Sequence, residues 1–278
     1  MSTVAAGGML RDDVLLEWYR YAPGPPVVLP AHSHEEYQLN VNLDAAGGVE
    51  YRGGYHAVPP GRLTVIMPGE RHRPRDPVAR EGSARHLTLY VRPSLLEQAA
   101  GEVAKRPALP AFGDLVVADE AAASDFVVTH TALRTAVTDL EREVRLVGWL
   151  TRLVQRHAEL PVAGRTPPVA HAAVRTAVDY LHAHRDGNVP LADLSAVSGL
   201  SPFHLTRQFR RAVGVPPHTY QLQLRIERAK RLLLDGHQVS ATAAEVGFFD
   251  LSHFTRHFKR HVGVSPGSYR DGKNVHPR

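Results

Sequence analysis

The sequence predicts an α+β chain of two domains. The first is an N-terminal β-barrel or sandwich followed by helices, and the second is an all-α C-terminal domain in which a long helix joins two copies of one helical unit. Three observations support this. Short apolar runs alternate with glycine and proline turns over the first 100 residues, a helical period dominates residues 124–160 and most of the chain after residue 168, and a segment of the C-terminal part occurs twice.

Length, hydrophobic content and the absence of cysteine indicate which kinds of protein this chain can be. The chain has 278 residues, 43% of them hydrophobic, which is enough for two domains with sizeable cores. It has no cysteine, so disulfides and cysteine-based metal sites or nucleophiles are excluded, and we expect a reducing, cytoplasmic location. No apolar run approaches about 18 residues, and the first ten residues lack the features of a signal peptide, so we expect no membrane segment.

The positive charge is concentrated near the C-terminus. The net charge is +5, but residues 169–278 hold 15 Lys and Arg against 8 Asp and Glu, or +7, while the rest hold 18 against 20, or −2. A local excess of this kind favours a polyanionic partner, nucleic acid first, although an idle basic surface would have the same composition.

Residues 1 to about 100 read as short strands separated by turns, the pattern of a sandwich or barrel. The clearest strands are 38–43, 63–67 and 86–91. The turn signals between them include 23–26, 47–48, 53–54 and 59–61.

Helices complete the predicted N-terminal domain, residues 1–160. Ser94 can cap a short helix that ends near Lys105, and Thr138 or Asp139 can divide the helical region at about 124–160. Its apolar residues fall near one face, which either packs on the barrel, forms a dimer interface, or does both. They are Leu133, Val137, Leu140, Val144, Val147 and Val154.

A linker is expected at residues 161–168, where three prolines and a glycine accompany little apolar content. The C-terminal domain then spans residues 169–278.

The strongest signal in this domain is a repeat with an offset of 49 residues. About 11 of 27 aligned positions are identical, so the two copies indicate duplication of one compact unit. The matches pair Val197 with Val246, His204 with His253, Thr206 with Thr255, Arg207 with Arg256, Phe209 with Phe258, 213–215 with 262–264, Pro217 with Pro266 and Tyr220 with Tyr269.

Each copy has the layout of a helix-turn-helix, at about 190–213 and 239–262. In the first, a helix at 191–197 is followed by a turn at 198–200 that contains a glycine. Ser201 then caps a second helix with Pro202 at its first position, and Gly214 ends it. Asp250 takes the capping place in the second copy.

The second helix of each unit combines an apolar side with a polar, basic side. Leu205 and Phe209, and likewise Phe254 and Phe258, are four residues apart and should face the core. The outward residues suit base edges and phosphates of a DNA major groove, although many surface helices are charged. They are Phe203, Thr206, Arg207 and Arg210 in the first unit, and Ser252, Thr255, Arg256 and Lys259 in the second.

A long helix is predicted between the units, from Pro216 to Asp235, with Leu222, Ile226, Ala229 and Leu233 on one face. A rigid helix can hold two DNA-contacting helices about one turn of DNA apart, roughly 34 Å. If this spacing does not match straight DNA, the duplex must bend, at a cost of about 1–6 kcal/mol.

These motifs resemble the AraC/XylS family of bacterial transcription regulators over residues 170–271. The resemblance rests on LSAVSGLS (194–201), HLTRQFRR (204–211), Gly214, Tyr220, Arg225, Ala229, Leu232 and Leu233 in the first half, and on VGF (246–248), Asp250, SHF (252–254), FKR (258–260), GVSP (263–266), Tyr269 and Arg270 in the second. It implies that Phe203, Thr206, Arg207, Ser252, Thr255 and Arg256 face bases, and that His204 and His253 serve packing or phosphate contact.

The N-terminal histidines resemble those of the cupin barrel, the sensor domain of many members of this family. His32 and His34 precede a strand, and PGERH ends another at His72. In metal-binding cupins two such histidines, a carboxylate and a later histidine hold one metal. Gln38 stands here where those cupins usually carry glutamate. Glu35 and Glu36 lie nearby, but we expect them to be out of phase with the metal-binding positions along the strand.

Three interpretations of this site stay open. His32, His34, Gln38 and His72 can hold a divalent transition metal, because imidazoles suit Zn, Ni, Cu or Fe, although glutamine is a weak ligand. They can line a metal-free polar pocket for a small effector, or they can simply be hydrogen-bonded to one another.

Together these features predict a sequence-specific transcription factor that responds to a small-molecule effector in the barrel. The resemblance implies an activator that binds promoter or operator DNA and contacts RNA polymerase, and a homodimer is expected. One alternative is a metal-dependent cupin enzyme with a DNA-binding tail, which Gln38 argues against. Another is a constitutive DNA binder whose barrel only dimerises. We expect no enzyme, since the sequence has no fingerprint of another enzyme class.

Overall fold

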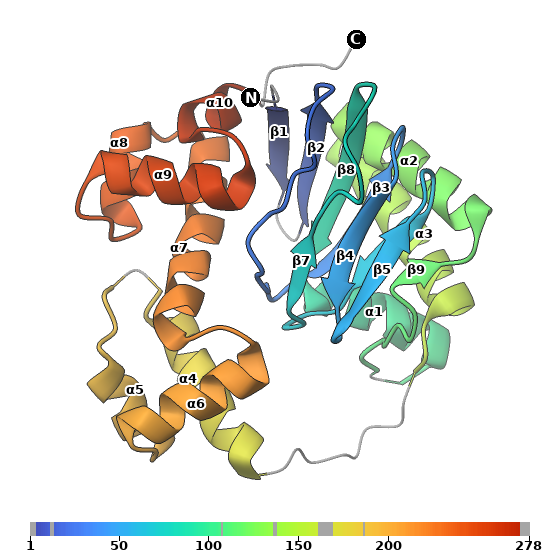
Figure 1. Cartoon of the computed structure of the whole chain (residues 1–278). Helices are drawn as coiled ribbons and strands as arrows, with labels where there is room; N and C mark the ends of the chain where they lie inside the picture. Colours follow the sequence, from blue (N-terminus) through green and yellow to red (C-terminus); the bar gives the residue numbers. More distant parts are fainter. Residues whose placement is uncertain are drawn as a thin grey trace. The chain divides into compact units, whose positions relative to one another are not determined.

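The computed structural model describes residues 4–11, 14–106, 108–135, 138–160, 169–185 and 187–272 (Figure 1). They form two compact units. The N-terminal unit consists of residues 4–28, 34–160 and 271–272, and the C-terminal unit of residues 29–33 and 169–270. The predicted linker, 161–168, lies outside the described residues.

Two antiparallel sheets form the N-terminal unit, as the strand pattern predicts (Figure 1). The large sheet has the order β1 (Val4–Arg11), β2 (Val14–Tyr21), β8 (Ala84–Val91), β3 (Tyr37–Asn42), β6 (Leu63–Ile66) and β9 (Val116–Val117). The small sheet has the order β5 (Gly54–Val58), β4 (Gly47–Tyr51) and β7 (His72–Pro74). The expected strands at 38–43, 63–67 and 86–91 correspond to β3, β6 and β8.

Strand β3 shows how the large sheet separates two environments. Leu39 and Val41 point to the side that the helices cover and belong to the main apolar core. Gln38 and Asn40 alternate with them and therefore point to the opposite side. One side of the large sheet thus stabilises the fold, while the other is polar.

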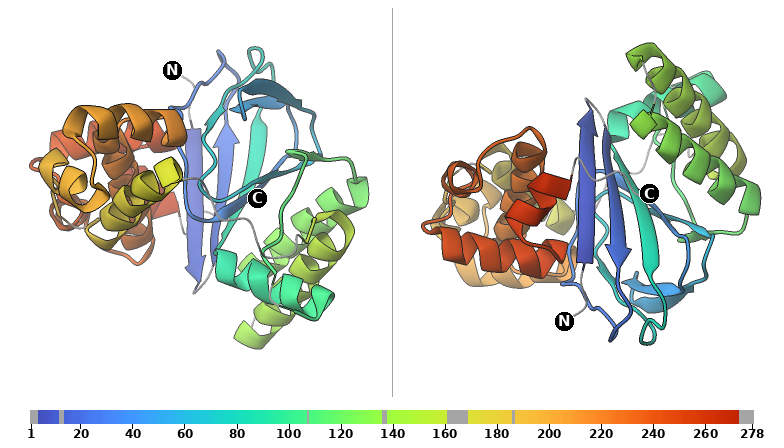
Figure 2. Two further views of the ribbon diagram at one scale, coloured as in Figure 1. Left: turned by 90° about the horizontal axis from the view of Figure 1, so that it is seen from below. Right: turned by 90° about the horizontal axis from the view of Figure 1, so that it is seen from above.

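Three helices cover the apolar side of the large sheet: α1 (Pro93–Ala104), α2 (Glu120–Thr135) and α3 (Asp139–His157) (Figure 2). The prediction that Ser94 caps α1 is wrong. The helix begins at Pro93, whose φ is already helical, and the cap position is Arg92 without a side-chain bond. Thr138 does cap α3, since its side chain accepts from the backbone N–H of Glu141 at 3.2 Å.

The predicted single apolar face of region 124–160 is also wrong. Leu133 and Val154 are buried in the core, but Leu140, Val144 and Val147 of α3 are exposed. The buried side of α3 instead comprises Leu146, Trp149, Leu150, Leu153 and Val154, and the ring of Trp149 lies 5.4 Å from that of Phe126 on α2. Helix α3 therefore has two apolar sides, one buried in the core and one exposed. Val137 lies outside the described residues.

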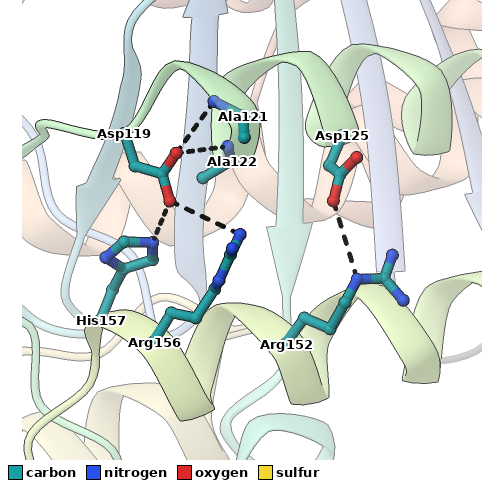
Figure 3. Close-up of polar contacts among 7 residues, drawn as sticks. All are labelled: Asp119, Ala121, Ala122, Asp125, Arg152, Arg156 and His157. Carbon is teal, nitrogen blue, oxygen red and sulfur yellow. Dashed lines mark hydrogen bonds and ion pairs between the residues drawn. The ribbon is translucent and has the colours of Figure 1, made fainter.

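Polar contacts fix the start of α2 against the end of α3 (Figure 3). One carboxylate oxygen of Asp119 accepts from the backbone N–H groups of Ala121 and Ala122, at 2.9 and 3.2 Å. The other lies 3.0 Å from His157 Nε2 and 3.7 Å from Arg156. The backbone N–H of Ala122, above all, holds the pKa of Asp119 below its usual value.

The C-terminal unit is helical, as predicted. It contains α4 (Val169–Ala183), α5 (Leu191–Ser198), α6 (Pro202–Val213), α7 (Pro217–Leu234), α8 (Val239–Glu245), α9 (Leu251–Val262) and α10 (Pro266–Asp271). Helices α5 and α6 form the first helix-turn-helix, and α8 and α9 form the second (Figure 1). None of the helices in the described part of the chain is long and apolar enough to cross a membrane.

The two helix-turn-helix units differ by one residue in the turn. The cap positions Pro190 of α5 and Gln238 of α8 are 48 residues apart, whereas Ser201 of α6 and Asp250 of α9 are 49 apart. The predicted match of Val197 with Val246 is therefore not a structural equivalence. Val197 is 39% exposed and Val246 is fully buried.

Candidate nucleic-acid interface and sensor face

Local sequence signals determine both ends of α6. The Ser201 side chain accepts from the backbone N–H of His204 at 3.4 Å, and Pro202 occupies the first helical turn. At the other end, Gly214 takes a left-handed φ of 86°, where a side chain would be strained. These signals set where α6 begins and ends, and hence which residues face outward.

Helix α9 is built in the same way. The Asp250 carboxylate accepts from the backbone N–H of His253 at 2.6 Å, and Gly263 ends the helix with a φ of 90°. A negative charge at a helix N-terminus also interacts favourably with the helix dipole.

The structure places the predicted DNA-contacting residues of α6 outside the core. Phe203 is 79% exposed, Arg207 and Arg210 are exposed, and Thr206 is half-buried with its hydroxyl donating to the Pro202 carbonyl at 2.8 Å. The residues predicted to face inward, Leu205 and Phe209, are fully buried.

Helix α9 repeats this arrangement. Ser252, Arg256 and Lys259 are exposed and Thr255 is half-buried. Phe254 and Phe258 are fully buried. Both helices therefore combine a buried aromatic or aliphatic side with an exposed basic side.

The cations on these helices carry uncompensated charge. Among the described residues, no acidic side chain pairs with Arg207, Arg210, Arg256 or Lys259. Arg228 of α7, in contrast, pairs with an acidic residue of α8 at 2.8 Å. The positive charge of α6 and α9 is thus available to an anionic ligand.

Helix α7 connects the two helix-turn-helix units without a break. Its 18 residues rise roughly 27 Å at 1.5 Å per residue. Ile226, Ala229 and Leu233 are buried as predicted, while Leu222 is only half-buried. A continuous, partly buried helix is a stiff connection.

The structure also shows a row of histidines on α9 that was not singled out from the sequence. The rings of His253 and His257 lie 4.4 Å apart between centroids, and those of His257 and His261 lie 6.3 Å apart. Burial is the main cause that lowers the pKa of both His257 and His261. His253 also contacts the buried ring of Phe248 at 5.5 Å, so it serves packing. The spacing of four residues is the signal that could have revealed the row.

In the N-terminal unit, three of the four predicted pocket residues lie together. His34, Gln38 and His72 are buried. The Nε2 atom of His34 lies 2.7 Å from Oε1 of Gln38, and the rings of His34 and His72 meet edge to face with centroids 5.0 Å apart. His32 belongs to the other compact unit, where its Nδ1 atom lies 3.0 Å from the Pro30 carbonyl oxygen.

A chain of hydrogen bonds extends this cluster across the polar side of the large sheet. Gln38 donates to Oδ1 of Asn40 at 3.0 Å, and Thr88 donates to the same oxygen at 2.9 Å. Asn40 in turn donates to Thr64 at 3.3 Å. Asn40 could have been found from the sequence, since it is two residues from Gln38; the two threonines come from other strands.

The donor set fits a transition metal poorly. Among the residues that the structure describes, no three His, Asp or Glu side chains are placed to hold a metal ion. The carboxylate of Glu70, in the PGERH segment, lies 3.0 Å from the Arg52 guanidinium instead. Two imidazoles and one neutral amide remain, a set suited to hydrogen bonding more than to metal binding.

Two histidines of the N-terminal unit, the half-buried His86 and the fully buried His130, have lowered pKa values. Burial lowers the pKa of His86, on β8, to about 4. Burial also lowers the pKa of His130, on α2, to about 4, and its Nε2 atom lies 3.2 and 3.3 Å from the carbonyl oxygens of Glu17 and Thr88. Both are therefore neutral near pH 7.

Comparison with known proteins agrees with this architecture. Residues 19–148 match the AraC-like ligand binding domain, and residues 194–272 match a helix-turn-helix domain. The arabinose operon regulatory protein of Escherichia coli (strain K12) is 30% identical over 219 residues, which cover 77% of this chain and 73% of that protein. The HTH-type transcriptional regulator YbfI of Bacillus subtilis (strain 168) is 27% identical over 237 residues, 85% of each chain.

The fold is also similar to that of ToxT from Vibrio cholerae O395, with a TM-score of 0.65 over 96% of this chain and all of that chain. Sequence identity to ToxT is only 11%, so this likeness concerns the fold alone. Taken with the two exposed basic helices and the polar sheet face, the matches show that the chain belongs to the AraC family of transcription regulators, with a ligand-binding domain and a helix-turn-helix domain.

Proposed function

We propose that this protein binds one promoter or operator duplex through α6 and α9, and that a small molecule on the polar side of the large sheet controls this binding. The observation that supports the proposal best is the duplicated placement of Arg207 and Arg256. Each is exposed and has no acidic partner among the described residues, on a helix whose opposite side is anchored in a core.

The two kinds of basic residue have different roles in this proposal. Arg207 and Arg256 contact guanine O6 and N7 atoms, for which a guanidinium is the best-matched side chain. Arg210 and Lys259, one helical turn further on, contact phosphates, which sets the position of each helix without selecting a sequence. Thr206 and Thr255 present their methyl groups to the groove. Phe203 and Ser252 lie at the start of each helix.

The stiffness of α7 determines the spacing of the two contacts. Because α6 and α9 are attached to one continuous helix, we infer that they enter successive segments of the major groove, about 34 Å apart on one side of the duplex. A mismatch with straight DNA would be relieved by bending, at about 1–6 kcal/mol.

The effector is, in this proposal, a small polar molecule. Gln38, Asn40, Thr64 and Thr88 line one side of the sheet with amide and hydroxyl groups that hydrogen-bond to one another. ToxT has been solved with an unsaturated fatty acid bound. The polar side chains of the present chain favour a ligand rich in hydroxyl or amide groups over a hydrocarbon chain.

A homodimer is proposed through α3. Leu140, Val144 and Val147 are exposed and spaced four and three residues apart, so they form one apolar stripe. The spacing is that of a helix seam that packs against another helix. A second copy of this chain offers the matching stripe in a symmetric dimer.

We propose an activator that contacts RNA polymerase, in line with the resemblance, and no enzymatic activity. The residues that a metal-dependent cupin enzyme would need are engaged otherwise, since Gln38 replaces the usual carboxylate and Glu70 pairs with Arg52.

The test is selection of bound sequences from random DNA by the full-length chain, followed by footprinting. Two protected major-groove segments about one turn apart are expected. Failure to enrich any sequence would contradict the proposal. Adding the right polar ligand at a hundredfold excess over Kd should raise the free energy of unfolding by about 2.7 kcal/mol, which is seen as a higher melting temperature. A constitutive DNA binder would show no such rise with any ligand.

A further inference from the structure

One residue of the second helix-turn-helix has no counterpart in the first. The left-handed glycines Gly199 and Gly247 are 48 residues apart, with φ of 67° and 78°, but the capping residues that follow them are 49 apart. Between glycine and cap the first unit therefore has one residue, Leu200, and the second has two, Phe248 and Phe249.

Phe248 takes the place of Leu200 in the packing. Leu200 is half-buried against the core of the first unit. Phe248 is buried, with its ring 5.2 Å from that of Phe254. Phe249 is then the additional residue, and its side chain is fully exposed to solvent. A second large apolar residue is not needed to complete this core.

The position of Phe249 connects it with the DNA-contacting side of α9. It directly precedes the cap residue Asp250, at the helix end whose residues contact base edges in helix-turn-helix proteins. The first unit also has an exposed phenyl ring at this end of its helix, Phe203, which is the second residue of α6. The two rings occupy different sequence positions, so the duplication alone does not explain why both units have one.

We propose that Phe249 contacts the C5-methyl group of a thymine in the major groove and so selects a T·A pair in the operator. This inference rests on the proposed function. An apolar ring matches the thymine methyl, which is the only apolar group on the major-groove edges of the four base pairs. The cations Arg256 and Lys259 on the same helix bring the ring to a polyanion, which argues for DNA over a protein as its partner.

The experiment replaces each thymine of the selected operator with deoxyuridine, which lacks only the methyl group. For the full-length chain, one replacement in the half contacted by α9 should weaken binding about fourfold, the factor that corresponds to about 0.8 kcal/mol per buried carbon. Phe249→Ala should weaken binding to the thymine operator by about tenfold and should bind the thymine and deoxyuridine forms equally at that position.

Two controls make the outcome interpretable. Because the Phe249 ring is fully exposed, Phe249→Ala should keep the melting temperature of the parent chain. Val78→Ala, at a 67% exposed position of the N-terminal unit, should change neither affinity nor the response to deoxyuridine.

The results separate this inference from the proposed function. If the parent chain selects no DNA sequence, the proposed function fails. If it selects an operator and Phe249→Ala still loses affinity on the same deoxyuridine replacement, the inference about Phe249 alone is overturned. It is equally overturned if Phe249→Ala keeps full DNA affinity but loses transcription activation, since the ring would then contact a protein.

Discussion

The ring of Phe209 lies edge-on to the ring of Tyr220, with 5.7 Å between centroids, and Phe258 meets Tyr269 in the same way at 5.5 Å. In each helix-turn-helix the phenylalanine comes from the second helix, α6 or α9, and the tyrosine from the helix that follows it, α7 or α10. The contact therefore couples the orientation of α6 and α9 to the rest of the unit. It also explains why both aromatic residues occur in both copies of the repeat.

The first prediction follows from this contact. Phe258→Ala should destabilise the protein by about 3–5 kcal/mol, because it removes a fully buried ring and leaves a cavity. Urea unfolding monitored by circular dichroism measures the change. The matched control is Phe203→Ala, whose ring is largely exposed and whose loss should change stability by less than about 0.5 kcal/mol. Equal effects of the two substitutions would contradict the assigned burial.

The second prediction concerns the arginines. Arg207→Ala or Arg256→Ala should weaken specific binding by about 1–3 kcal/mol and relax the preference at one base pair. Arg210→Ala or Lys259→Ala should weaken binding to all sequences similarly and lower the slope of log K against log salt by about 1. Titrations with operator and random DNA at several salt concentrations distinguish the two patterns. A uniform loss for Arg207→Ala would show that this residue contacts only phosphate.

The third prediction concerns oligomeric state. Val144→Lys, in the middle of the apolar stripe of α3, should turn a dimer into a monomer at micromolar concentration, because it places a charge at the seam. Val78→Lys introduces the same charge at an equally exposed position outside the stripe and should leave the dimer intact. Sedimentation equilibrium gives both masses. A parent chain that sediments as a monomer would refute the α3 interface outright.

The fourth prediction is a loss of stability in acid. The pKa of His130 is lowered to about 4 in the folded state by burial, against an ordinary value of 6.5. Below pH 6.5 the unfolded chain therefore binds a proton that the folded chain does not, so stability falls as pH decreases from 6.5 to about 4. The contribution of His130 is about 3 kcal/mol over this range, at 1.36 kcal/mol per pKa unit.

Unfolding in urea at pH 7.5 and pH 4.5 measures this effect. His130→Gln should be less stable at pH 7.5 but should lose less stability on acidification than the parent. His204→Gln is the control, since His204 lies exposed on the surface of α6. An identical pH response of the parent and His130→Gln would show that His130 does not titrate in this way.

The fifth prediction concerns metal. Since Gln38 offers only a neutral amide beside two imidazoles, dialysed protein should hold less than one equivalent of Zn, Ni, Cu or Fe by elemental analysis. Gln38→Glu supplies the carboxylate that metal-binding cupins use and should raise the retained metal. A tightly held stoichiometric metal in the parent chain would overturn the view of this cluster as a polar ligand site.

Much of the C-terminal domain could be predicted because its signals are local. Ser201, Asp250 and Gly214 mark helix ends through contacts within four residues, and the spacing of Phe254 and Phe258 identifies the inward side of α9. The expected strand at β3 likewise follows from alternation within a single segment, and those at β6 and β8 follow from short apolar runs bounded by turns. The same local pattern identifies the inward residues of each helix. It therefore also predicts that the candidate DNA-contacting residues lie outside the core.

Two errors concern where a helix begins or is interrupted. Ser94 has the chemistry of a cap, but Pro93 already starts α1. Leu133 and Leu140 appear to share a face in the sequence, yet the break between α2 and α3 places one in the core and the other in solvent.

By itself, the sequence determined the ends of α6 and α9, the duplicated unit, the basic side of each of these two helices and the polar alternation of β3. Those features depend on residues a few positions apart, within reach of one helical turn or one strand repeat. Only the tertiary structure decided that His34 meets His72, that Val246 is buried while Val197 is not, and that Phe249 is left outside the core. Burial depends on which segments pack together, and segments far apart in the chain supply that packing.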